Sequence, residues 1–290
     1  MKSRSAFRVS SLLLCGLLGA GVAGSAAAQS ASGAEGLLND KWVFNLGMFV
    51  VSSSLKANLN GQSVDNPEID FDDTFGNARD ATRVRGDVLW RITPAHHLRF
   101  MYFDNTNTRT KVLQEDLPWG DYTFLSGSSA KLRQKLQVFE LGYEYAFMRS
   151  PTYEVAATIG VHYSDLKLEL SGTADYSGPD CGEPPCTATA SKSSKSLPAP
   201  LPVIGLRGGW VVAQDWFVDA SAQFFKIKAG DYDGNWSDLR VNATWMFHRN
   251  YGVGLGYDRF ATRVDVSKND FDGRLKTSYS GLQAFLTGTY

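Results

Sequence analysis

Apolar and polar residues alternate along most of this 290-residue chain, and no long stretch has the period of an α-helix. Successive side chains of a β-strand point to opposite faces, so alternation with period two predicts strands with one apolar and one polar face. Residues 41–53 are an example, because apolar side chains occupy the even positions from Trp42 to Val50. The pattern predicts an all-β protein.

The predicted strands are joined by connections that alternate between short and long. The strands cover residues 41–53, 81–92, 98–103, 138–147, 155–164, 203–212, 216–225, 239–248, 251–258 and 281–290. The short connections are 93–97, 148–152, 213–215 and 248–250, and the longer polar ones lie near 57–80, 105–131, 166–199, 227–237 and 266–274. This rhythm is typical of an antiparallel transmembrane β-barrel with an even number of strands. We expect about ten strands; eight or twelve are the alternatives, since 105–131 and 166–199 leave room for another hairpin.

Aromatic residues gather near the short connections and the chain end. They are Trp42, Trp90, Tyr145, Phe147, Tyr153, Trp210, Trp216, Trp245, Phe247, Tyr251 and Tyr290. A sparser set, at the opposite strand ends, comprises Tyr163, Phe224, Tyr257 and Tyr279. A soluble β-sandwich would concentrate its aromatics in mid-strand, whereas two belts are typical of membrane interfaces.

The N-terminus has the features of a secretory signal peptide. A basic start precedes an apolar run over residues 9–23, and Ala26-Ala27-Ala28 provides a small-residue cleavage site. We therefore expect a signal peptide at 1–28, a periplasmic segment at 29–40 and the barrel at 41–290. The exported chain would reside in a bacterial outer membrane.

Cys181 and Cys186 are the only cysteines after the predicted signal peptide. An even pair in an exported chain predicts a disulfide, because C-x4-C with no further Cys or paired His is a poor zinc site. The surrounding loop, 171–196, is polar and of low complexity. It is expected at the cell surface, where it could meet lipopolysaccharide or a protein partner.

The final segment, 281–290, ends in Tyr290 and has apolar residues at every second position before it. It resembles the C-terminal assembly signal of Gram-negative outer-membrane β-barrel proteins. The resemblance implies insertion by the barrel-assembly machinery through Tyr290, and contact with outer-membrane lipid and lipopolysaccharide. In size and layout the chain is similar to small OmpA-like and OmpW-like barrels.

Charged residues on the predicted inward faces suggest the state of the lumen. The positive ones are Arg83, Arg85, Arg99, Arg207 and Arg240, and the negative ones are Asp87, Glu140, Glu144, Asp219 and Asp258. A balanced set can form a network of ion pairs, which predicts a closed or very narrow lumen. In the alternative arrangement, arginines and carboxylates segregate on opposite walls and create a transverse field for small solutes. We therefore expect a non-enzymatic barrel, either a structural envelope protein or a narrow porin-like channel.

An enzymatic alternative rests on His162-Tyr163-Ser164. This tripeptide resembles the H-x-S motif of outer-membrane phospholipase and lipid A deacylase. Alternation places His162 and Ser164 on one face, as a His-activated serine nucleophile requires. However, Asp165-Leu166 stands where those enzymes have Asn-Gly, and the pattern directs the pair toward the lumen. Catalysis on lipid or lipid A is thus the second hypothesis.

Other polar residues have simpler interpretations. An omptin-like protease would need opposed Asp-Asp and Asp-His pairs, and no Asp-x-His occurs here. The remaining histidines, His96, His97 and His248, are expected to be solvated at turns. The near-neutral balance of 29 Lys and Arg against 30 Asp and Glu argues against nucleic-acid binding.

Two acidic segments have some of the features of a cation-binding site. Asp231, Asp233 and Asn235 alternate around a glycine as in a calcium loop, but the bidentate Glu at the twelfth position is missing. A hairpin turn also selects Asp, Gly and Asn, and it is the favoured interpretation. The acidic cluster at 65–73 is expected to be solvated loop charge. No metal and no cofactor are expected.

Overall fold

The computed structural model describes residues 33–58, 68–75, 78–119, 122–176, 186–193, 199–230, 232–268 and 271–290. The predicted signal peptide, its cleavage site and Cys181 lie outside these residues.

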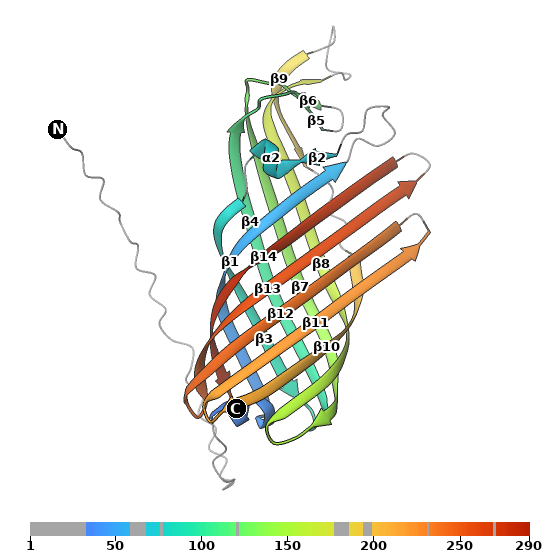
Figure 1. The fold of residues 1–290 in the computed structure, drawn as a ribbon. Coiled ribbons are helices and arrows are strands. Elements are labelled where there is room, and N and C mark those ends of the chain that lie inside the picture. The colour runs from blue at the N-terminus through green and yellow to red at the C-terminus, as the bar shows by residue number, and fades with distance from the viewer. Residues whose placement is uncertain are drawn as a thin grey trace, which may run out of the picture. The chain divides into compact units, whose positions relative to one another are not determined.

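Within the described residues, ten strands form a closed ring (Figure 1). They are β1 (Trp42–Asn58), β3 (Ala78–Arg91), β4 (His96–Val112), β7 (Ser129–Arg149), β8 (Tyr153–Tyr176), β10 (Ala199–Ala213), β11 (Trp216–Ala229), β12 (Tyr232–His248), β13 (Tyr251–Lys268) and β14 (Phe271–Thr289). Each pairs antiparallel with the next along the chain, and β14 closes the ring on β1 with Leu46 opposite Leu286. The predicted all-β, antiparallel barrel of about ten strands is confirmed.

Several strands run well beyond their predicted ends, so the predicted long loops are wrong in extent. β4 continues to Val112 and β7 begins at Ser129, while β11 and β12 extend into the predicted loop 227–237. The predicted loop 105–131 contains the extra hairpin for which it had room, formed by β5 (Leu117–Trp119) and β6 (Tyr122–Phe124). This hairpin is not part of the ring, because β6 pairs with the end of β8. β2 (Ile69–Asp70) and β9 (Cys186–Ser193) likewise pair only with β1 and β8.

The alternation of the sequence becomes an apolar outer surface. Met48, Val84, Leu255 and Leu282 are 59–70% exposed, whereas the side chains between them on each strand face inward. On the outer surface near the short turns, Trp42 and Trp90 stack with ring centroids 5.3 Å apart, and Trp216 and Trp245 stack at 6.5 Å. One predicted belt residue is wrong: Tyr279 is 5% exposed and points into the lumen.

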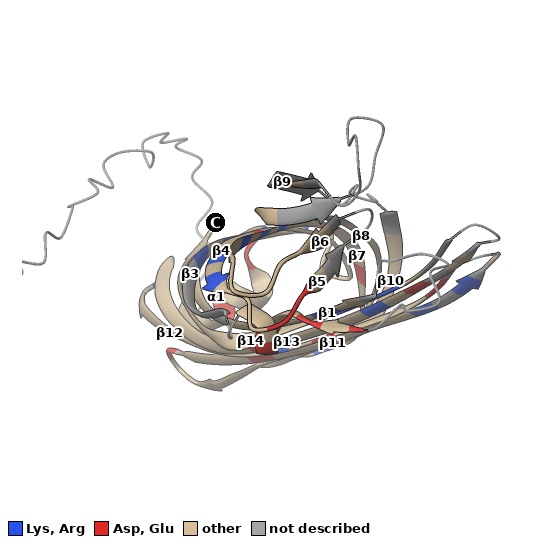
Figure 2. Cartoon of the chain, turned by 90° about the horizontal axis from the view of Figure 1, so that it is seen from above, with Lys and Arg blue, Asp and Glu red and all other residues tan. Residues whose placement is uncertain are grey.

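The described part of the chain contains two short helices beside the ring, although the sequence predicted none. α1 (Gly33–Asn39) lies in the segment predicted to be periplasmic, and α2 (Phe71–Phe75) lies at the end of the long loops, near the upper part of β1 (Figure 1). Seen from above, α1 lies inside the ring of strands (Figure 2). No described helix is long and apolar enough to cross a membrane.

Candidate functional site

The lumen is the candidate site, and α1 fills its short-turn end. Ala34 and Leu38 are fully buried and pack with Leu37 against inward-facing residues of the barrel wall. These wall residues are Val43, Leu89, Val211, Phe217 and Met246. A helix of seven residues is too short to be stable alone, so this apolar contact provides much of its stability.

Two wall arginines bind the C-terminal end of α1. Arg91 donates from Nη2 to the carbonyl oxygen of Leu37 at 2.6 Å and from Nη1 to that of Asp40 at 2.7 Å. Arg149 donates to the carbonyl oxygen of Leu38 at 2.6 Å and to Asn39 Oδ1 at 2.9 Å. The last carbonyls of a helix have no intrahelical partner and carry partial negative charge, so guanidinium groups are suitable partners.

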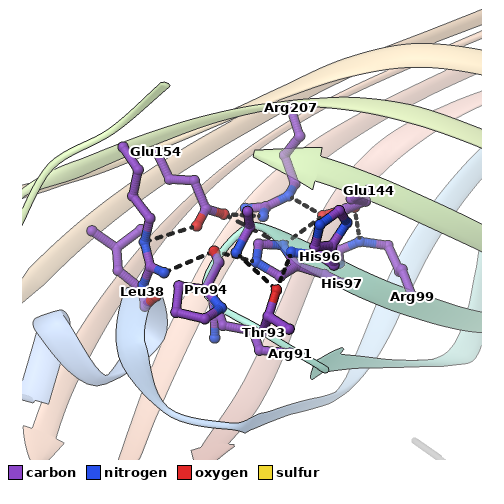
Figure 3. A network of polar contacts seen from close by, with 12 residues as sticks. Leu38, Arg91, Thr93, Pro94, His96, His97, Arg99, Glu144, Glu154 and Arg207 are labelled. Carbon is purple, nitrogen blue, oxygen red and sulfur yellow. Dashed lines mark hydrogen bonds and ion pairs between the residues drawn. The ribbon is translucent and has the colours of Figure 1, made fainter. Parts of the chain in front are cut away.

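Beyond α1 lies a group that we call the central ion network: Asp87, Arg99, Glu144, Arg207 and Glu154. Its members other than Asp87 are labelled in Figure 3. Arg99 contacts Asp87 at 3.0 Å and Glu144 Oε1 at 2.7 Å. Arg207 contacts Glu144 Oε2 at 2.9 Å and Glu154 Oε1 at 2.6 Å. Glu144 and Glu154 are at most 1% exposed, so each carboxylate requires these cations for its burial.

Sequence reasoning missed two members of this region. Glu154 follows a short turn at the start of β8. The only sequence signal for its inward orientation is that it shares the even positions of the strand with Thr158 and His162. His97 is fully buried, 3.9 Å from Glu144 Oε2 and 3.8 Å from Glu154 Oε1 (Figure 3). The prediction that His97 is solvated at a turn is therefore wrong, because β4 already begins at His96.

A second charged cluster lies across the lumen from β3. Arg85 forms a buried ion pair with Asp258, and Asp258 is also contacted by Arg240 Nε at 3.3 Å. Arg240 further contacts Asp238 at 3.7 Å, a carboxylate that the sequence analysis did not select. Because β3 and β13 are three positions apart in the ring, the Arg85 contact crosses the interior.

His162 belongs to the same interior. Its Nε2 lies 2.9 Å from Glu140 Oε2, and Glu140 Oε1 accepts a hydrogen bond from Gln223 Nε2 at 2.7 Å. The imidazole stacks on Trp236 with ring centroids 4.3 Å apart, and it is 2% exposed. Ser164 belongs to β8, but the structure does not describe its side chain.

The remaining predicted lumen residues also face inward. Asp219 accepts from Asn242 at 3.0 Å, and Arg83 Nε donates to Asn105 Oδ1 at 2.6 Å. Cations and carboxylates are thus interspersed around the lumen and pair with one another. The alternative in which they segregate on opposite walls is not what the structure shows.

An aromatic layer, formed by Phe49, Phe103, Trp236, Phe260 and Tyr279, closes the lumen above the charges. Phe103 on β4 lies 5.3 Å from Tyr279 on β14, and Tyr279 stacks on Phe260 at 4.8 Å. Phe260 in turn lies 5.7 Å from Trp236 on β12. The rings therefore form a continuous bridge across the barrel.

Small cavities lie within the polar interior. The larger of two has a volume of about 50 Å³, and its lining includes Asp87, Arg99, Glu144, Asp219 and Arg240. A site for a small organic ligand typically has roughly 300–1,000 Å³. The cavity has room for only a few water molecules, which could bond to the buried polar atoms around it.

The long-loop end is filled by α2 and a further apolar cluster that includes Leu55, Phe71, Phe75, Leu132 and Leu170. Several acidic residues predicted to be solvated anchor α2 and its neighbours instead. Asp72 contacts Arg109 at 2.9 Å and accepts from the backbone N–H of Leu55 at 3.1 Å; Asp70 contacts Lys56 at 2.5 Å; Glu68 contacts Lys276 at 2.7 Å. The prediction of solvated loop charge is wrong for Asp72, whose side chain is 10% exposed, whereas Glu68 and Asp70 stay in contact with solvent within their ion pairs.

The two predicted ligand or disulfide loops lie partly outside the described residues. Asp231 is outside them, whereas Asp233 and Asn235 belong to β12 and pair with Lys228 and Lys226 of β11. A regular strand cannot wrap these oxygens around one cation, and the described residues contain no cluster suited to a metal ion. Cys186 begins β9, but neither its side chain nor Cys181 is described.

Comparison with solved structures finds proteins of known function that have a similar fold. The outer membrane protease OmpT from Escherichia coli superposes with a TM-score of 0.55 at 13% identity, over 86% of this chain and 96% of OmpT. The chain has the fold of an outer-membrane β-barrel. At this identity the likeness concerns the barrel's architecture alone.

Other outer-membrane barrels superpose with lower scores. The P. putida toluene transporter TodX has a TM-score of 0.38 at 7% identity over 90% of this barrel and 93% of TodX. The translocator domain of autotransporter NalP from Neisseria meningitidis has 0.42 at 8% identity, over 87% and 91%. No protein-family model matches this barrel, and no curated protein matches it.

Proposed function

We propose that the protein is a non-enzymatic, non-conducting barrel of the bacterial outer membrane that supports the envelope. The observation that carries this proposal is the filled lumen. α1, the central ion network, the aromatic layer and the α2 cluster occupy it at successive levels from one end to the other. A narrow porin-like channel would need a continuous aqueous path, and this packing favours the structural role instead.

The proposed location follows from the outer surface. Leu255 and Leu282 are 70% and 68% exposed within a band of aliphatic side chains around the ring. In water such a band would be an aggregation liability, whereas in a bilayer it contacts lipid tails. The C-terminal strand keeps the pattern that resembles an assembly signal, and Tyr290 is 70% exposed. We therefore propose export through the predicted signal peptide and insertion by the barrel-assembly machinery.

Planar-bilayer recording of the refolded barrel tests this function. We expect no stepwise conductance at moderate voltage, because every level of the lumen is blocked. Discrete openings that change when Arg85→Gln or Glu140→Gln is introduced would instead establish a channel through the barrel's own interior. Folding of the sample is checked by the slower gel migration after boiling, and incorporation by co-flotation of the barrel with lipid vesicles that are then fused to the bilayer.

The hydrolase hypothesis is less well supported. His162 is held by Glu140 and Trp236 in the closed interior, where a lipid ester on the outer surface does not reach it. A purified, lipid-reconstituted sample should release no fatty acid above a protein-free control. Hydrolysis that is present in the parent and lost in Ser164→Ala would make the barrel an enzyme.

A further inference from the structure

We propose that the outer face of β4 and β7, above the lipid-facing band, binds a phosphate-bearing glycolipid of the outer leaflet. This inference rests on the proposed location of the barrel in the outer membrane. The surface concerned consists of Lys131, Arg133 and Lys135 on β7, together with Thr106, Thr108 and Thr110 on β4. We call it the cation-threonine ladder.

The ladder is set by the alternation and register of the two strands. On β7, Leu132, Gln134 and Leu136 are buried, so the basic residues between them face outward. The register then places each cation directly beside a threonine: Lys135 beside Thr106, Arg133 beside Thr108, and Lys131 beside Thr110. Ammonium, guanidinium and hydroxyl groups are the usual protein partners of phosphate and sugar oxygens.

The three cations have no internal partner. Within the described residues, the side chains of Lys131, Arg133 and Lys135 form neither an ion pair nor a hydrogen bond. By contrast, two exposed cations elsewhere have carboxylate partners: Lys56 contacts Asp70, and Arg263 contacts Asp265. Glu169 on β8 flanks Arg133 on the side away from β4, but it has an interaction of its own. The ladder therefore offers positive charge to a partner outside the barrel.

The height of the ladder above the lipid-facing band indicates which partner it binds. Immediately toward the membrane on the same outer wall, Tyr102, Phe139 and Tyr163 are 46–48% exposed, in the position of an interfacial belt. From Lys135 to Lys131 the strand then runs about 14 Å at about 3.4 Å per residue, which at a tilt of about 40° is a rise of about 10 Å. A glycerophospholipid presents its phosphate at one depth only. Cations at three depths, each with a hydroxyl beside it, match a taller headgroup built of sugars with several phosphates, as in lipopolysaccharide.

A matched pair of triple variants tests the ladder. The ladder variant is K131Q/R133Q/K135Q. The control is K226Q/K228Q/R259Q, which removes three exposed cations from β11 and β13 and, like the ladder, breaks no ion pair among the described residues. Binding of fluorescent short-core lipopolysaccharide to the full-length barrel is measured in detergent, beside the same glycolipid after phosphate removal and beside phosphatidylglycerol.

We expect the ladder variant to bind phosphorylated lipopolysaccharide about 100-fold more weakly at low salt, given the contribution of a basic residue near an anionic surface. The control variant should change binding less than about threefold, and the dephosphorylated glycolipid and phosphatidylglycerol should bind the parent weakly. T106V/T108V/T110V keeps the charge and shape and should cause a smaller loss.

Three results would overturn the proposal: equal losses in the two charge variants, which indicate bulk electrostatics; equal binding of phosphatidylglycerol; or an unchanged affinity in the ladder variant. Each variant is also recorded in planar bilayers and checked for heat-dependent gel migration. The proposed sealed function fails only if conductance appears, so the two failures are distinguishable.

Discussion

The ring of Phe103 on β4 lies 5.3 Å from the ring of Tyr279 on β14, although these strands are three positions apart in the barrel. Rings of neighbouring strands meet along the wall, whereas this contact spans the interior. Arg85 with Asp258, and Gln223 with Glu140, make comparable crossings among the charged residues. Walls three strands apart are thus held together by both apolar and polar contacts, and these contacts support the sealed lumen that we propose.

Neutralising Glu144 should destabilise the whole barrel. Glu144→Gln leaves Arg99 and Arg207 buried without their shared carboxylate, and breaking a buried ion pair from one side costs about 3–5 kcal/mol. Urea unfolding of the refolded barrel, followed by tryptophan fluorescence, measures the change. Asp215→Asn, at an exposed turn, serves as the control and should lie within about 0.5 kcal/mol of the parent. A loss for Glu144→Gln no larger than for this control would contradict the account.

Removing Arg91 should release α1 while the ring of strands stays closed. Arg91→Met deletes two charged hydrogen bonds to the helix end, each with a contribution of about 1.5–3 kcal/mol. Amide hydrogen exchange in α1 should then accelerate at least tenfold, with β12 and β13 unchanged. Exchange in α1 that stays at the parent rate would show that apolar packing and Arg149 hold the helix without Arg91.

Much of the barrel could be predicted because each strand buries one face. The alternation from Trp42 to Val50 is enough to assign β1, and the same reasoning gives the other nine strands of the ring. Tyr279 shows how a local assignment fails. Tyr279 has an odd residue number, as do the polar residues Gln283 and Thr287 of the same strand, and this alternation indicates the inward face. Its nearness to a strand end instead suggested the outer aromatic belt.

The parts that could not be predicted depend on distant partners. α1 has too few residues to show a helical period, and it is held by Arg91 and Arg149, which are more than fifty residues away in the sequence. The outer half of β4 has polar residues on both faces, so no apolar alternation marks it as a strand. Its backbone pairing with β7 reaches Val112 opposite Ser129 all the same.

Acidification should loosen α2 at the long-loop end. Burial raises the pKa of Asp70, but hydrogen bonds from Lys56 and from the backbone N–H groups of Asp73 and Asp72 outweigh it, so the net pKa lies below the usual 3.8. A depressed pKa means that this contact stabilises the fold above about pH 4 and is lost as the pH falls through the folded-state value. Carboxyl NMR should give a midpoint below 3.8 for Asp70, and Lys56→Met should raise it. A parent midpoint at or above 3.8 would refute this assignment.

The central claim, a sealed lumen, is tested most directly by single-molecule conductance of the parent beside a deliberately opened variant. The variant lacks residues 33–39 and 71–75 and carries Arg99→Ser, Arg207→Ser, Phe103→Ser and Tyr279→Ser, so that each of the four levels that fill the lumen loses its centre. The account predicts a silent parent and stepwise currents in the opened variant. Currents of the same size in both proteins would contradict it, because they would show that these elements never closed the barrel.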